Sequence, residues 1–434
     1  MVGRWGARLV LQVALAALVV GARACAVLWS GPVLMPDTER YRDVADRLAP
    51  FEVWEGHGPG VLLQAVYLLP ADAAVVVQTV LAGACWAVAA VYLAGAVTRS
   101  SWSWVVFATV TAWSLSPWFL VWDDWLMTEA VTCGGCALAA AGLGSWARGR
   151  GGGLLLGLVG VSIAVLARPF VAALLVPLLL MTAWPVARAG GRRVGAALAA
   201  AALLGGFAAW QTIALARVDA LPYSYTPQPE SLAAVQATDR LAGRGDVPGY
   251  LDLARQHGMP PCPAAEAVVT GPDDVFERVE ALRAITACPD LDTWLDDGGL
   301  SWTAELGENT SNTAKELVDP DSWLSDSFNH YIYASPRTLK PRSWARARWP
   351  DVVRAVNGAM LLSTLVAVVV GLARARGGRL LVATATTWTA MFVVVSWAVD
   401  GMEYWRHLLP AFPALTILCA ALVLTSSVGE AHES

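Results

Sequence analysis

The sequence predicts an all-α polytopic membrane protein with about ten transmembrane helices and a small α or α+β extracytoplasmic domain. Of its 434 residues, 56% are hydrophobic and the mean hydropathy is +0.51, whereas a soluble domain of this size needs a more polar surface. Charged residues make up only 15%, against about 25% in ordinary soluble proteins. The charges gather in short breaks between apolar runs and in one long central segment, which is typical of membrane spans separated by loops.

Apolar runs of spanning length recur along the chain, and each approaches the roughly 20 residues that cross a bilayer. They lie at about 7–30, 71–98, 101–121, 126–146, 193–216, 351–373, 380–399 and 408–427. A longer stretch, 152–187, is interrupted by Arg168-Pro169. A charge followed by a helix breaker predicts a turn between two short spans there. The first run is longer than the hydrophobic region of a signal peptide, so we expect it to be retained.

Arginines in the short loops predict the orientation of these spans, because cytoplasmic loops are enriched in positive charge. With both termini in the cytoplasm, every short loop on the inner side contains arginine. These arginines are Arg4, Arg8, Arg99, Arg148, Arg150, Arg188, Arg192, Arg193, Arg374, Arg376 and Arg379. The opposite face then receives the loops that contain most of the conspicuous acids.

The chain divides into three parts. Residues 1–216 form an N-terminal transmembrane module, 217–350 an extracytoplasmic domain, and 351–434 the C-terminal transmembrane helices. The central segment is acidic and the chain has no basic stripe, which argues against a nucleic-acid partner. Cys262 and Cys288 are the two cysteines of this segment, and in an oxidising compartment they are expected to form a disulfide.

The first outer loop places Asp37 directly after the first span. Apolar residues recur after it at helical spacing, so a short amphipathic helix along the membrane surface is expected; they are Tyr41, Val44, Ala45 and Leu48. Asp37 is then either an N-cap of that helix or a base held where an acceptor hydroxyl and a lipid phosphate meet. His57, near the end of the loop, is either a surface residue or a donor to phosphate.

The second outer loop is short and contains Asp123, Asp124 and Glu129. Acids at the entrance to a span are costly, and intramembrane acids usually face a bundle interior or a cavity. They are either solvated loop acids or functional groups, and Glu129 fits the second description better than the others.

Two arginines, Arg168 and Arg406, fall on the same outer side as these acids. Each is either a snorkelling residue that reaches the headgroups or a bidentate ligand for phosphate oxygens. A carboxylate that removes a proton from a hydroxyl, together with cations that stabilise a phosphate leaving group, is what sugar transfer from a lipid phosphate requires.

The order of these motifs resembles the GT-C class of membrane glycosyltransferases, most closely the enzymes related to protein mannosyltransferases and aminoarabinose transferases. The stretch Asp37-Thr38-Glu39-Arg40-Tyr41 with Ala45 is similar to their first outer loop, although Thr38 stands where the family has the second acid of a pair. His57-Gly58-Pro59 and Leu126-Met127-Thr128-Glu129-Ala130 resemble two further elements, as do Arg168-Pro169 and the stretch 403–410. The resemblance covers nearly all the spans but not 217–350.

The resemblance implies an enzyme of the plasma membrane with its active site on the extracytoplasmic face. Asp37 would be the catalytic base, with Asp124 and Glu129 as further catalytic candidates, and His57, Arg168 and Arg406 would bind the donor phosphate. The donor would be a polyprenyl-phosphate sugar, with mannose or arabinofuranose as the sugar. The acceptor would be a cell-wall glycan, a lipid or a protein. Cofactor need stays open, with Asp123 and Asp124 as candidate ligands of a divalent metal.

Three other classes of protein share some of these features. A non-catalytic transporter or flippase of a lipid-linked sugar would also have a cavity and arginines, but it more often shows internal repeats, which this sequence lacks. A polysaccharide polymerase or ligase would place its chemistry on a different large loop. A structural membrane protein would not need Asp37, Asp124 and Glu129 on one face.

Overall fold

The computed structural model describes residues 2–32, 38, 42, 60–97, 100–120, 122–168, 171, 175, 178–179, 251–252, 255, 266, 350–375, 378–399 and 410–424. Over these residues the elements are α-helices and no strand is present. Asp37, His57, Arg406, Cys262 and Cys288 lie outside the described residues, as does nearly all of the segment 217–350.

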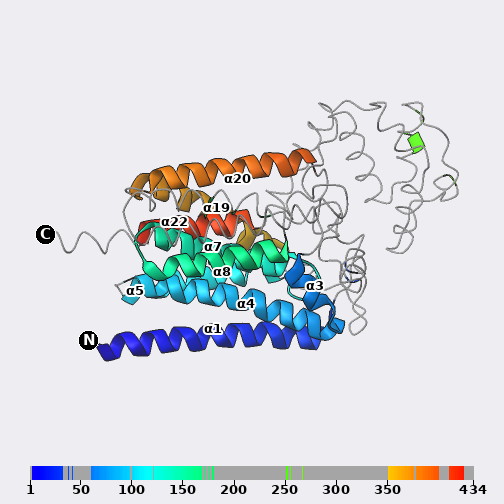
Figure 1. Ribbon diagram of the computed structural model, residues 1–434, viewed down its shortest axis with the longest axis horizontal. Helices are drawn as coiled ribbons and strands as arrows, with labels where there is room; N and C mark the ends of the chain where they lie inside the picture. The colour runs from blue at the N-terminus through cyan, green and yellow to red at the C-terminus, as the bar shows by residue number, and fades with distance from the viewer. Residues whose placement is uncertain are drawn as a thin grey trace.

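The N-terminal helices are α1 (Val2–Ser30), α3 (Val61–Tyr67), α4 (Ala71–Ala96), α5 (Ser100–Ser114), α6 (Pro117–Leu120), α7 (Glu129–Ala147) and α8 (Gly151–Ala167). Three C-terminal helices follow, α19 (Pro350–Arg374), α20 (Arg379–Val399) and α22 (Ala411–Leu424). Figure 1 shows the long helices running side by side as a bundle, with α3 at the end where α8 finishes. The predicted helical class is therefore confirmed for the described part of the chain.

Three helices are long and apolar enough to cross a membrane, at Gly6–Ser30, Ala71–Ala96 and Glu129–Ala147. Shorter apolar helices lie at Gly152–Ala167, Gly358–Arg374 and Ala411–Leu424. These helices support the prediction of a membrane protein. Large apolar side chains on α1, including Leu18 and Trp29, are exposed on the surface of the bundle, as expected for a face that meets lipid rather than water.

Helix α7 lies at the centre of the bundle. Every residue from Glu129 to Trp146 is buried, and α7 packs against α4, α8 and α22, most extensively against α8. The two backbones approach closely at glycines: a Cβ on Gly142 would lie 2.2 Å from the nitrogen of Gly157, and one on Gly160 would lie 2.2 Å from the nitrogen of Ala139. Small residues allow such close helix packing inside a membrane.

Four of the five described cysteines are buried with free thiols: Cys85, Cys133, Cys136 and Cys419. Cys133 and Cys136 lie within the buried stretch of α7. Their burial agrees with a packing role for these small side chains.

Two chain breaks set the shape of the bundle end. The run 101–121 was expected as one span, but the structure divides it into α5 and α6 at Leu115 and Ser116. Pro117 supplies the reason, because a residue before proline avoids the helical region and proline is favoured at the first position of a helix. The expected break at Arg168 is present, since α8 ends at Ala167.

Candidate functional site

Described residues of the predicted first and second outer loops meet at one end of the bundle. Thr38, which follows Asp37, is buried, and its Oγ1 donates to the carbonyl of Leu126 at 3.2 Å. Gly60, three residues after His57, donates its backbone N–H to the carbonyl of Ala167 at 2.8 Å. Segments of the first outer loop therefore contact both the second loop and the end of α8.

Gly60 is required at its position by the closeness of this contact. A Cβ added to Gly60 would lie 2.2 Å from the carbonyl oxygen of Leu166, far inside van der Waals distance. The chain that leaves the first outer loop thus passes directly over the last turn of α8, beside Arg168.

Glu129 and Arg168 form an ion pair in the protein interior. Arg168 Nη1 donates to Glu129 Oε1 at 2.8 Å, and the exposed fractions of the two residues are 2% and 0%. Thr128 Oγ1 lies 3.4 Å from Glu129 Oε2. Arg168 is therefore buried and bonded to a carboxylate in this structure. The sequence predicted only that Glu129 and Arg168 lie on the same side of the membrane. In the structure their side chains are in direct contact.

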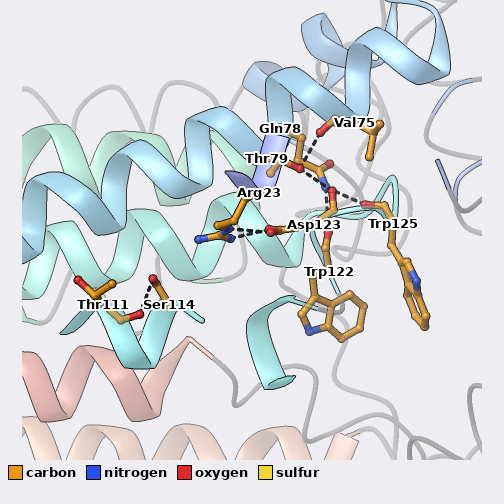
Figure 2. A network of polar contacts seen from close by, with 9 residues as sticks. All are labelled: Arg23, Val75, Gln78, Thr79, Thr111, Ser114, Trp122, Asp123 and Trp125. Atoms are coloured by element: carbon orange, nitrogen blue, oxygen red, sulfur yellow. Dashed lines mark hydrogen bonds and ion pairs between the residues drawn. The ribbon is translucent and has the colours of Figure 1, made fainter. Parts of the chain in front are cut away.

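A second buried ion pair joins α1 to the second loop. Arg23 donates Nε to Asp123 Oδ2 at 2.7 Å and Nη2 to Asp123 Oδ1 at 2.5 Å, which is the bidentate geometry that guanidinium and carboxylate favour. Figure 2 shows Arg23 reaching from α1 to Asp123 across the interior. Burial raises the pKa of the Asp123 carboxyl above its ordinary value, and the bonds from Arg23 act in the opposite direction.

The second loop is also held by side chains of α4. Gln78 Nε2 donates to the carbonyls of Trp122 at 3.2 Å and Trp125 at 2.7 Å, and Thr79 Oγ1 donates to the carbonyl of Asp123 at 2.6 Å. Figure 2 shows Gln78 and Thr79 reaching this loop from α4. Tyr67 in turn donates its hydroxyl to Gln78 Oε1 at 3.1 Å. Buried amide and hydroxyl groups that bond backbone carbonyls in this way fix a short loop.

The three acids of the second loop therefore have different surroundings. Asp123 and Glu129 are buried and bonded to arginines, whereas Asp124 is partly exposed. Both oxygens of Asp123 accept a hydrogen bond from Arg23. No three His, Cys, Asp or Glu side chains gather as a metal-binding group in the parts of the chain that the structure describes.

Arg23, Gln78 and Thr79 were not among the residues that the sequence predicted for this site. A signal was present for Arg23, because an arginine seven residues before the end of an apolar span needs a partner in the interior. Gln78 and Thr79 gave no comparable signal, since single polar residues in a membrane helix are common at helix contacts.

Comparison of the chain with protein-family models, with curated proteins and with solved structures finds no match.

Proposed function

We propose that the chain is a membrane glycosyltransferase that moves a sugar from a polyprenyl-phosphate donor to an extracytoplasmic acceptor. The observation that carries this proposal is the convergence at one bundle end of Thr38, the loop 122–128, Glu129, Arg168 and Gly60. Thr38 directly follows Asp37, the expected base, and Gly60 lies three residues after His57, which is expected to bind phosphate. Arg168 is itself an expected phosphate ligand. A single site that brings both functions together is what such a transfer needs.

In the proposed reaction the Asp37 carboxylate takes the proton of an acceptor hydroxyl. The hydroxyl oxygen then bonds to the anomeric carbon of the donor sugar. The bond between that carbon and the phosphate oxygen breaks, and the polyprenyl phosphate leaves with the electron pair. Arg168, together with His57 and Arg406, is proposed to stabilise the negative charge of the leaving phosphate.

The two other candidate acids take different proposed roles. Glu129 is buried against Arg168, which favours a role in orienting that guanidinium. Asp124 is partly exposed and is the alternative base. We further propose, from the sequence, that the chain has about ten spans and cytoplasmic termini. The 217–350 domain, with a Cys262–Cys288 disulfide, is proposed to lie on the acceptor side of the plasma membrane.

The direct test measures donor consumption by the purified full chain in nanodiscs, with polyprenyl-phosphate mannose and polyprenyl-phosphate arabinofuranose offered separately. The acceptor is supplied by a cell-envelope extract. Asp37→Asn keeps the size of the side chain but cannot accept the proton, so the rate should fall by about 10²–10⁴-fold. Binding of undecaprenyl phosphate should persist in the same variant.

A near-normal rate in Asp37→Asn together with an inactive Asp124→Asn would assign the base to the second loop. Full rates in Asp37→Asn, Asp124→Asn and Glu129→Gln would reject the enzyme and favour a transporter or flippase of a lipid-linked sugar.

A further inference from the structure

Thr38 connects the first outer loop to the second. Its side chain is buried, and its hydroxyl donates to the Leu126 carbonyl across 88 positions of sequence. Asp37 precedes Thr38 directly, and Asp124 lies two residues before Leu126. The bond therefore links two short segments that each contain a candidate catalytic acid.

The acceptor of this bond belongs to a rigid loop. Gln78 and Thr79 of α4 bond three carbonyls of the segment 122–125. Tyr67, the last residue of α3, donates its hydroxyl to the amide oxygen of Gln78. Leu126 follows this segment directly and is itself buried. The Thr38 hydroxyl therefore bonds the carbonyl of a residue that directly follows a segment held by α4.

The chain that leads to Thr38 is anchored from the other side as well. Arg23 fastens α1 to Asp123 of the same loop. Gly31 then turns the chain with a φ of 73°, a left-handed conformation that glycine adopts readily. Arg23 and Thr38 thus both contact the loop 122–128, and only six residues separate Gly31 from Thr38.

We propose that Thr38 is a positioning residue of the transfer reaction, and that its bond to the Leu126 carbonyl anchors the chain next to Asp37 at the second loop. This role rests on the proposed function of Asp37 as base. A base works only within hydrogen-bond reach of the proton that it removes, and a displacement of about 1 Å can lower a rate by as much as about 10²-fold. The hydroxyl of Thr38 can donate a hydrogen bond to a backbone carbonyl, whereas an ionised carboxylate at this position could only accept one.

The experiment compares four variants of the full chain in nanodiscs. Thr38→Val removes the hydroxyl and keeps the shape, whereas Thr38→Ser keeps the hydroxyl. Thr132→Val is the matched control. Thr132 is also buried, but its hydroxyl donates to the carbonyl of Thr128, the N-cap residue of the same helix, and the backbone N–H of Thr132 donates to that carbonyl too. Asp37→Asn reports separately on the proposed function.

Two quantities are measured: kcat and KM for the polyprenyl-phosphate sugar that the parent consumes, and amide hydrogen exchange of the peptides that contain Thr38 and residues 122–128. Thr38→Val should lower kcat by up to about 10²-fold with an unchanged donor KM, and should speed exchange of the peptide that contains Thr38. Thr38→Ser should restore both quantities, and Thr132→Val should match the parent.

The positioning role is overturned if Thr38→Val keeps the parent kcat and exchange while Asp37→Asn is inactive, an outcome that leaves the proposed function intact. A fully active Asp37→Asn rejects the proposed function itself. If Thr38→Val does not insert, Thr38→Ala removes the hydroxyl without crowding, and the same comparison with Thr38→Ser applies.

Discussion

At the residue scale, the interior of the described part of the protein contains two arginines that each neutralise a carboxylate: Arg23 with Asp123 and Arg168 with Glu129. A charge buried in a membrane bundle is costly unless it is paired. Each pair also joins elements that are distant in sequence, so it contributes to the arrangement of the bundle end as well as to its neutrality. The two pairs differ in surroundings, because Arg168 lies beside the first outer loop and Arg23 lies within α1.

The Arg23–Asp123 pair should behave as a structural contact. Arg23→Met leaves the Asp123 charge buried and uncompensated, which should destabilise the folded protein by about 3–5 kcal/mol. The double variant Arg23→Met with Asp123→Leu removes both charges and should recover most of that loss. Thermal unfolding in detergent measures the difference. Arg374→Met, at an exposed position at the end of α19, is the control, and equal unfolding of the Arg23 and Arg374 variants would contradict a structural role.

The Arg168–Glu129 pair should instead affect donor binding. Arg168→Ala should weaken binding of undecaprenyl phosphate, and Arg168→Lys should restore it only in part, because lysine lacks the planar guanidinium. Glu129→Gln removes a negative charge beside Arg168 and should keep or strengthen that binding. Native mass spectrometry with the lipid measures all three. Weakened binding in Glu129→Gln equal to that in Arg168→Ala would show that the pair matters only for folding.

At the element scale, the contact between α7 and α8 holds Glu129 at the start of one helix opposite Arg168 at the end of the other. The helices approach through glycines, and the turn between them contains Gly149 with a φ of 85°. Any change that separates the two helices would also separate the ion pair. The geometry of the candidate site therefore depends on a backbone contact well away from it.

Gly142→Ala tests this contact. The added Cβ would lie 2.2 Å from the nitrogen of Gly157, so the helices must separate, and overpacking of this kind typically costs about 1–3 kcal/mol. Gly21→Ala in α1 is the matched control, since nothing lies within 4 Å of its added Cβ, and alanine favours a helix over glycine by about 1 kcal/mol. Unfolding in detergent should separate the two variants, and equal stability would mean that the close approach is unimportant.

The sequence anticipated the helices better than the contacts between them. Hydropathy located the ends of α4, α19 and α20 within a few residues, because the length of an apolar run is a local property. The break at Ser116 was missed, since the apolar run continues through it and only Pro117 marks it. The partner of Arg23 could not be identified, because Asp123 lies 100 positions away and a single sequence contains no information on which distant residues meet.

At the scale of the whole molecule, Thr38, Gly60, the loop 122–128 and the Arg168–Glu129 pair meet at one end of the described helix bundle. Large apolar side chains are exposed on the described helices. This arrangement suits a site at the membrane surface, where a lipid phosphate and a water-soluble acceptor can meet. The loop 122–128 lies at the centre of these contacts, since α4, α1 and Thr38 all bond to it.

The proposed orientation in the membrane rests on the arginines of the short loops. Reporter fusions at residue 149, in the turn between α7 and α8, and at residue 434 should both report the cytoplasm, whereas a fusion at residue 300 should report the outside. Fusions at 149 and 300 that report the same side would reject the assigned orientation and, with it, an extracytoplasmic site.

One end of the bundle is proposed to bind the phosphate of a polyprenyl donor opposite the base. A structure determined by electron cryomicroscopy of the full chain with bound undecaprenyl phosphate tests this proposal most directly. The phosphate should lie at the end where Arg168, Gly60, Thr38 and the loop 122–128 meet, with the Asp37 carboxylate across from it. A phosphate bound at the opposite end, beside the Gly149 turn, would contradict both the site and the glycosyltransferase proposal.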